Sequence, residues 1–261
     1  MLKLTIFNFL QLIIIALLLF AVKKTVKTER AQRVLLFVSP IVTILFHYSS
    51  FIFSAIGGAG ADAINYLKEN PNLILPIYPC NVVMWSALIL PFIKNKDSRL
   101  CCLLTDYVFW FGIFSTLVGM FANVDFINNP TLRDYEIVKS IVAHATLLFN
   151  VLLLALFGRI KIDVSRNMKN MMLSVIGMYV IGLYCNLVFK VLVSFEEAYD
   201  VNSMFIIHSP FEGLGFLTYP TIAVTALVLY FILFFTCDFI KCKKGERWFD
   251  SLACRKKSRK N

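Results

Sequence analysis

The chain has 261 residues, of which 59% are hydrophobic and 16% are charged, and it contains 25 phenylalanines. A soluble domain of this length needs more polar surface. The composition and a mean hydropathy of +0.74 therefore exclude an ordinary soluble protein and indicate a polytopic membrane protein. The formal net charge of +10 comes from basic residues concentrated between and after the apolar segments, which favours a role in membrane topology over nucleic-acid binding.

Seven apolar segments follow one another, each close to the ~20 residues with which a helix crosses a ~30 Å hydrocarbon core. They are Leu4–Val22, Val34–Ile56, Leu75–Ile93, Cys101–Phe121, Ile137–Phe157, Met171–Phe195 and Leu217–Phe239. We expect helices, because lipid offers no hydrogen bonds to backbone N–H and C=O groups. The sequence therefore predicts an all-α bundle of about seven transmembrane helices, with one domain over residues 1–240 and a basic tail over residues 241–261.

The basic residues alternate between successive connections. The connections after the first, third and fifth segments carry five, three and four, the tail carries nine, and the other connections carry one, one and none. Because cytoplasmic loops hold an excess of Lys and Arg, this alternation predicts an N-terminus outside and a C-terminus in the cytoplasm. The first segment is interpreted as a retained helix, because no small-residue cleavage site follows its long apolar stretch.

Polar residues from four predicted helices fall in the outer half of the membrane. At 1.5 Å per helical residue, Cys80 lies ~8–9 Å, His144 ~10–11 Å and His47 ~13–14 Å from the outer end of its segment. Asn186 and Lys190 are four residues apart and share one helix face. We expect that face to point into the bundle, because a charged or amide side chain in lipid is costly.

Only two of the seven cysteines lie in this outer half. The other five, at or beyond the cytoplasmic ends, are Cys101, Cys102, Cys237, Cys242 and Cys254. Thiols in the cytoplasm stay reduced, and their spacing does not match a zinc site, so neither a disulfide framework nor a metal is expected. A disulfide between Cys80 and Cys185 is the structural alternative to a reactive Cys80.

Cys80 and His144 together suggest nucleophilic catalysis. A thiol in apolar surroundings is unreactive, but an adjacent imidazole can take its proton and give a thiolate. A thiolate attacks an ester and forms a thioester, so an acyl chain could pass between two lipids without ATP or acyl-CoA. Asn81 or Tyr78 could hydrogen-bond the developing oxyanion, and exclusion of water would favour transfer over hydrolysis.

Each of these residues also has a structural interpretation. A buried cysteine is often a small apolar residue, a transmembrane His or Asn is often a hydrogen-bond partner between helices, and Lys190 could extend to the interface. Four residues spaced three or four apart form a stripe of small and polar side chains that predicts close helix packing: Gly112, Thr116, Gly119 and Asn123. The loop from Glu196 to Phe216 is either a lid over a site or a plain connection.

Three segments, in this order, resemble the signatures of one family. They are LPIYPCN at Leu75–Asn81, FWFG with GMFANVD between Phe109 and Asp125, and DYEIVKSIVAH at Asp134–His144. Together they resemble the transmembrane protein 164 / YwaF-like integral membrane proteins, over roughly residues 34 to 240. The resemblance implies a membrane acyltransferase in which Cys80 matches the nucleophile and His144 the essential histidine.

The sequence thus predicts an acyltransferase that moves acyl chains between membrane phospholipids, with no cofactor, no metal and no nucleic acid, in the cytoplasmic membrane of a bacterium. Its oligomeric state stays open. Substrate contacts are assigned to Tyr78, Asn81, His47, Asn123, Asn186 and Lys190. Lipid hydrolysis would use the same acyl-enzyme. A transporter with a polar site in the bundle, or an interaction protein without chemistry, would leave Cys80 a packing residue.

Overall fold

The computed structural model describes residues 2–56, 66–67, 70–123, 126–127, 131–192, 202–207, 209, 214–243 and 247–250. These residues form helices and connections without a β-strand, so the all-α prediction is confirmed. The long helices are α1 (Leu2–Thr25), α2 (Glu29–Ile56), α8 (Tyr135–Leu156), α9 (Val164–Leu192) and α10 (Tyr219–Lys241). The side chain of Lys190 and residues 251–261 of the predicted tail lie outside the described part.

The middle of the chain is divided into shorter helices. They are η1 (Pro71–Leu73), α4 (Pro79–Ile89), η2 (Leu90–Phe92), α5 (Arg99–Asp106), η3 (Tyr107–Phe111), α6 (Gly112–Phe121) and, further on, η4 (Ser203–Phe205). In the helix that runs from α5 to α6, η3 is a five-residue π-helical stretch. Six helices of the described chain are long and apolar enough to cross a membrane, the α5–η3–α6 helix among them.

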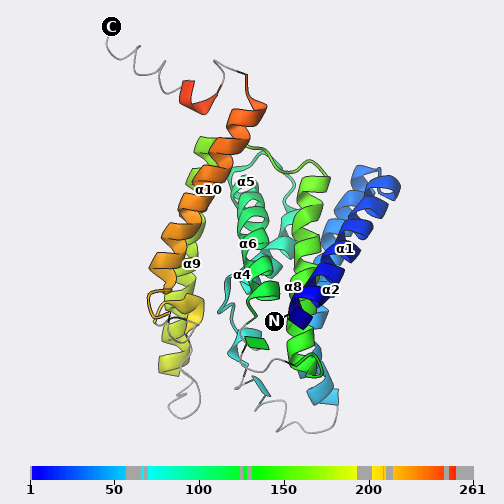
Figure 1. Cartoon of the computed structure of the whole chain (residues 1–261), viewed down its shortest axis with the longest axis vertical. Coiled ribbons are helices and arrows are strands. Elements are labelled where there is room, and N and C mark those ends of the chain that lie inside the picture. The colour runs from blue at the N-terminus through cyan, green and yellow to red at the C-terminus, as the bar shows by residue number, and fades with distance from the viewer. Residues whose placement is uncertain are drawn as a thin grey trace.

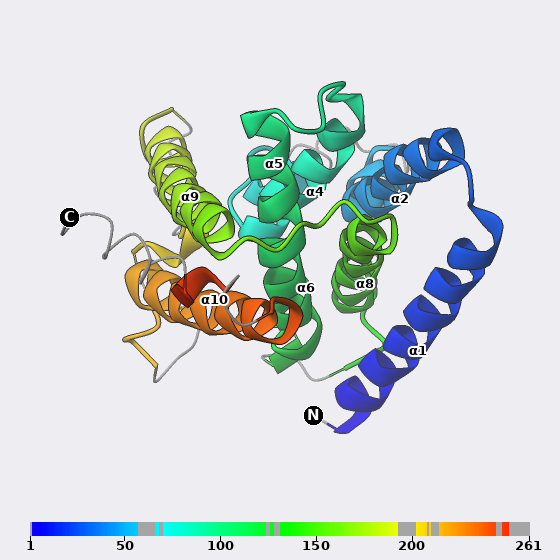
Figure 2. The same cartoon turned by 90° about the horizontal axis from the view of Figure 1, so that it is seen from above.

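The helices form a bundle in which α8 holds a central position. It packs against α2, α6 and α1. Figures 1 and 2 both show α9 and α10 side by side at one edge and α1 at the opposite edge, with α4, α6 and α8 between them. The buried Asn8 fixes α1 to the bundle, because its Nδ2 donates a hydrogen bond of 2.6 Å to the Met120 carbonyl.

The third apolar segment differs from the sequence prediction. We expected a helix over Leu75–Ile93, but the helix begins only at Pro79, because proline lacks an N–H and suits the first position of a helix better than its interior. Together α4 and η2 have 14 residues (11 plus 3), or about 21 Å of helix, which is less than a ~30 Å core. The outer part of this segment is irregular backbone. Such backbone is tolerated at membrane depth only where protein covers it.

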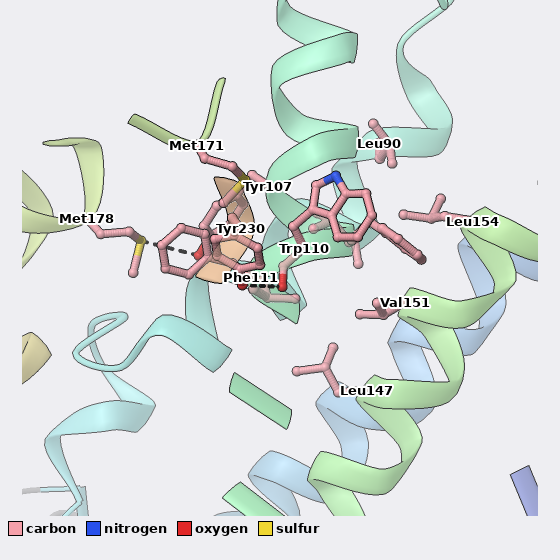
Figure 3. Close-up of a cluster of buried hydrophobic side chains, with 14 of the residues drawn as sticks. Leu90, Tyr107, Trp110, Phe111, Leu147, Val151, Leu154, Met171, Met178 and Tyr230 are labelled. Carbon is pink, nitrogen blue, oxygen red and sulfur yellow. Dashed lines mark hydrogen bonds between the residues drawn. The ribbon is translucent and has the colours of Figure 1, made fainter. Parts of the chain in front are cut away.

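The π-helical stretch lies in the core of the bundle. All five of its side chains are buried, and Figure 3 shows Tyr107, Trp110 and Phe111 among Met171, Met178 and Tyr230. The Tyr230 hydroxyl of α10 donates a hydrogen bond of 2.6 Å to the Trp110 carbonyl. Because a π-turn disturbs the regular i→i−4 ladder, this tyrosine satisfies a carbonyl within that turn.

The predicted small-residue stripe on α6 allows close helix approach. A Cβ on Gly112 would lie 2.5 Å from Val151 Cγ2 of α8 and 3.2 Å from Val83 Cγ1 of α4. Thr116, one turn further along, is fully buried and donates to the Gly112 carbonyl at 2.6 Å. The stripe therefore brings α4, α6 and α8 together at one junction, as small residues do between membrane helices.

Candidate functional site

Cys80 is the second residue of α4, directly after the break in the third segment. Tyr78 has extended backbone angles and precedes the helix, and Pro79 is its first residue. Cys80 is a half-buried free thiol that packs against the main apolar core. Burial opposes a thiolate, whereas the positive end of the helix dipole favours it, so the local structure makes this cysteine different from one in mid-helix.

Asn81 caps this helix and meets a histidine. Its Oδ1 accepts a hydrogen bond of 3.1 Å from the Tyr78 N–H, which turns its Nδ2 toward His47 Nε2 on α2, 3.4 Å away. His47 Nε2 is also 3.4 Å from the Asn72 carbonyl. Only a protonated Nε2 can donate to that carbonyl, and only an unprotonated Nε2 can accept from Asn81, so the two contacts belong to different proton positions. The structure thus brings together two predicted site residues, His47 and Asn81, beside Cys80.

His144 is oriented from both sides of its ring. Its Nδ1 is 2.7 Å from the Ser140 carbonyl, which can only accept, so Nδ1 carries the proton of the neutral ring and Nε2 is the basic nitrogen. The face of the ring covers Gly119 of α6, where a Cβ would lie 2.3 Å from Nε2. Asn123 Nδ2 donates to Ser140 Oγ at 3.1 Å and to the Gly119 carbonyl at 3.3 Å. Asn123 therefore holds the two residues that orient His144.

Cys80 and His144 lie on helices that meet at the same junction, at different heights. Val83 and Val151 meet at Gly112. On α4, Cys80 lies about one turn before Val83 and on the same side of the helix. On α8, His144 lies about two turns before Val151 and on the same side of that helix. At 1.5 Å per residue these positions differ by roughly 6 Å along the bundle, with Cys80 the deeper. The sequence had predicted nearly equal depths, and the break before Pro79 accounts for the difference.

Asn186 supports the segment before Cys80 from the other side. Its Oδ1 accepts from the Ser203 N–H at 2.8 Å, and Ser203 Oγ donates to the Ile77 carbonyl at 2.9 Å. The Met204 N–H donates to the same carbonyl at 2.8 Å. Of the predicted substrate contacts, Asn186 thus fixes a loop, while Tyr78 places its ring 5.7 Å from that of Phe205 in this loop.

Residues 202–207 of the long outer loop cover the irregular backbone of the third segment. Met204 and Phe205 have positive φ angles of 56° each, which is uncommon for residues other than glycine. Met204 Cγ and Ile206 Cδ1 would lie 2.8 Å and 2.6 Å from a Cβ on Gly182, so α9 receives this loop at a glycine. The lid interpretation is compatible with this arrangement, and the other residues of the predicted loop lie partly outside the described part of the chain.

The contact of Tyr107 with the start of α4 was not predicted from the sequence. Its hydroxyl lies 3.1 Å from the Pro79 carbonyl and 3.2 Å from Met178 Sδ, the second of which Figure 3 shows. The carbonyl is the stronger acceptor, so the hydroxyl ties the π-helical stretch to the first residue of α4. The only sequence signal was a tyrosine at the start of an aromatic run, which is equally typical of packing.

Cys80 and Cys185 are both free thiols, so the structure does not contain the disulfide that was the alternative. Cys185 is buried against Ile77 and Phe189, beneath the loop. Across the described residues, groups of three or more His, Cys, Asp or Glu that could hold a metal ion are absent. The site is built from a thiol, two imidazoles and amide side chains.

These features define a polytopic, all-helical membrane protein whose third apolar segment is broken just before a cysteine. The chain matches the TMEM164 family over residues 2–238 and belongs to that family. Neither the curated proteins nor the solved structures contain a match to the chain.

Proposed function

We propose that this protein is a membrane acyltransferase that moves fatty acyl chains between phospholipids through a thioester on Cys80, with His144 as the base. The observation that supports this most is the position of Cys80 in the first turn of α4, one turn before Val83, which lies at the same α4–α6–α8 junction that the helix of His144 reaches through Val151.

The reaction has two halves that use the same groups. In the substrate complex, where such contacts tighten to hydrogen-bond distance, His144 Nε2 takes the Cys80 proton, and the thiolate attacks the ester carbonyl of a donor phospholipid. The tetrahedral intermediate expels the lipid alkoxide, which takes the proton back from the imidazolium and leaves as a lysophospholipid. His144 then takes a proton from the hydroxyl of an acceptor lysophospholipid, whose oxygen attacks the thioester and releases the thiolate.

The amide of Asn81 is the proposed oxyanion donor. Asn81 directly follows the proposed nucleophile in the sequence. The hydrogen bond that its Oδ1 accepts from the Tyr78 N–H fixes the side chain and so the position of Nδ2. A donor fixed in this way stabilises developing charge without reorganisation during the reaction. His47 Nε2 lies 3.4 Å from this nitrogen, so the proposed role of His47 is to position the Asn81 amide and not the Cys80 thiol.

The surroundings of the thiol favour transfer over hydrolysis. The loop over Ile77 and the aromatic pair of Tyr78 and Phe205 cover the outer side of the segment that leads to Cys80. Where water is kept from a thioester, a lipid hydroxyl becomes the acceptor. We place this chemistry in the outer leaflet of a bacterial cytoplasmic membrane, because the basic residues concentrate in the connections at the other end of the bundle.

The test is direct detection of the acyl-enzyme. Purified protein is incubated with a phospholipid that carries a labelled acyl chain, and the adduct is treated with neutral hydroxylamine, which cleaves thioesters. We expect a labile adduct that maps to Cys80 and is absent from Cys80→Ala. The matched control is Cys185→Ala, which removes the other thiol of the outer half. An adduct that persists in Cys80→Ala while Cys185→Ala abolishes it would reject the assignment.

A further inference from the structure

A cavity of about 550 Å³ lies at the opposite end of the bundle from the Cys80 site. It is enclosed by α2, by α4 with η2, by α5 and by α8, and it opens at the connections that carry most of the basic residues. Its size is within the ~300–1,000 Å³ usual for ligand sites. The cavity is lined neither by Cys80 nor by His144.

The mouth of this cavity is positively charged. It is lined by five basic residues and two acidic ones, a difference of three: Lys27, Arg33, Lys96, Arg159 and Lys161 against Glu29 and Asp97. The positive-inside rule explains why basic residues occur at this end. It does not require that residues from three separate connections line the mouth of one cavity.

The two carboxylates do not neutralise this mouth. Glu29 forms a salt bridge with Lys96, and Asp97 with Lys161 at 3.2 Å. The side chain of Arg159 is only 21% exposed. Its nearest carboxylate is that of Glu29, 3.9 Å away, and Glu29 already pairs with Lys96. Arg33 has no carboxylate within ion-pair distance among residues that the structure describes. Two guanidinium groups at the mouth are thus available to an anion.

The walls behind the mouth combine apolar side chains with the buried polar side chains of Thr105 and Asn150. Leu36, Ala87, Leu90 and Leu154 line the cavity and are buried in the core of the bundle. Because the cavity lies at the ends of three candidate spans, those that contain α2, α5 and α8, a ligand with a charged end and a hydrocarbon end fits its chemistry better than a small polar ion.

We propose that this cavity binds an anionic phospholipid of the cytoplasmic leaflet, with the phosphate at Arg33 and Arg159 and an acyl chain along Leu36, Ala87 and Leu154. A guanidinium recognises a phosphate by paired N–H donors, which suits Arg better than Lys. The site does not depend on the chemistry at Cys80. It would couple the protein to the anionic lipid content of its membrane.

The test compares ligands on the unmodified full chain in detergent by native mass spectrometry. Phosphatidylglycerol supplies phosphate and acyl chains, phosphatidylcholine supplies a zwitterionic headgroup, and inorganic phosphate supplies the anion alone. We expect phosphatidylglycerol to remain bound, phosphatidylcholine to bind less, and inorganic phosphate in excess to leave the bound lipid in place. Displacement by inorganic phosphate, or equal retention of the two lipids, would overturn the proposal.

Variants then locate the site. The double variant Arg33→Gln/Arg159→Gln should lower retention of phosphatidylglycerol roughly tenfold, because hydrogen bonds to charged groups are among the stronger ones. The matched control Lys23→Gln/Lys24→Gln removes the same charge from the end of α1, outside the cavity, and should change retention less than twofold. Ala87→Leu narrows the cavity without a change of charge and should also lower the retention of phosphatidylglycerol. Equal losses in the charge variant and its control would show surface attraction only and reject the site.

Discussion

The imidazole of His144 lies against the backbone of Gly119, so closely that a Cβ at Gly119 would be 2.2 Å from Cδ2 and 2.6 Å from Cγ of the ring. Glycine is therefore required there by the position of the histidine, because real side chains do not approach to such distances. The ring is fixed between this glycine and the Ser140 carbonyl, 2.7 Å from Nδ1. Any side chain at Gly119 must displace His144 or push α6 away from α8.

Gly119→Ala should therefore lower acyl transfer strongly while costing moderate stability. Overpacking of this kind costs about 1–3 kcal/mol, and a displacement of a catalytic group by ~1 Å can cost roughly a hundredfold in rate. Transfer of a labelled chain to a lysophospholipid and thermal unfolding in detergent measure the two effects. The control is Gly177→Ala on α9, where a Cβ has open space and should change neither. Unimpaired acyl transfer by the Gly119→Ala variant would show that the proposed reaction does not need this ring position.

The two histidines should have separable roles. His144→Ala removes the proposed base, so the thioester should form at least a hundredfold more slowly, within the ~10²–10⁴-fold range of general base catalysis. His47→Ala removes only the partner of Asn81 Nδ2 at 3.4 Å and should lower the rate about tenfold or less. Single-turnover labelling of Cys80 compares them. The reverse order would move the role of base to His47.

Much of this arrangement could be predicted from the sequence, but the contacts between helices could not. Hydropathy located the apolar segments, and the small-residue stripe at Gly112 and Gly119 predicted close packing. The start of α4 at Pro79 was missed, because an average over apolar residues does not register Pro76 and Pro79 as a break. The contact of His47 with Asn81, and that of Tyr107 with Pro79, depend on how helices rotate against one another. The residue spacing along one helix does not contain this information.

Tyr107→Phe tests the support of α4 from the π-helical stretch. The change removes the hydroxyl that donates to the Pro79 carbonyl and should cost about 0.5–1.5 kcal/mol of stability. It should also slow thioester formation, because the first turn of α4 carries Cys80. Tyr230→Phe is the matched control, since its hydroxyl donates to the Trp110 carbonyl of the same π-helical stretch and not to α4. We expect it to lower stability by a similar amount without changing the rate of Cys80 labelling. If both variants label Cys80 at the unmodified rate, Tyr107 has only a packing role.

The loop over the third segment should control the ratio of transfer to hydrolysis. Ser203 donates to the Ile77 carbonyl at 2.9 Å, and Asn186 accepts from the Ser203 N–H at 2.8 Å, so Asn186→Ala removes the acceptor that holds this loop. Loss of a buried hydrogen-bond partner costs about 1–3 kcal/mol, enough to open the loop locally without unfolding the bundle. Faster amide exchange at Ser203 and Met204 should report the opening.

Water would then reach the proposed thioester, so free fatty acid should increase relative to acylated acceptor lipid, while formation of the Cys80 adduct stays close to normal. Asn202→Ala serves as the comparison, because Asn202 Oδ1 accepts from the Ile207 N–H inside the loop. An Asn186→Ala variant with faster exchange at the loop but an unchanged product ratio would show that this loop does not keep water from the proposed thioester.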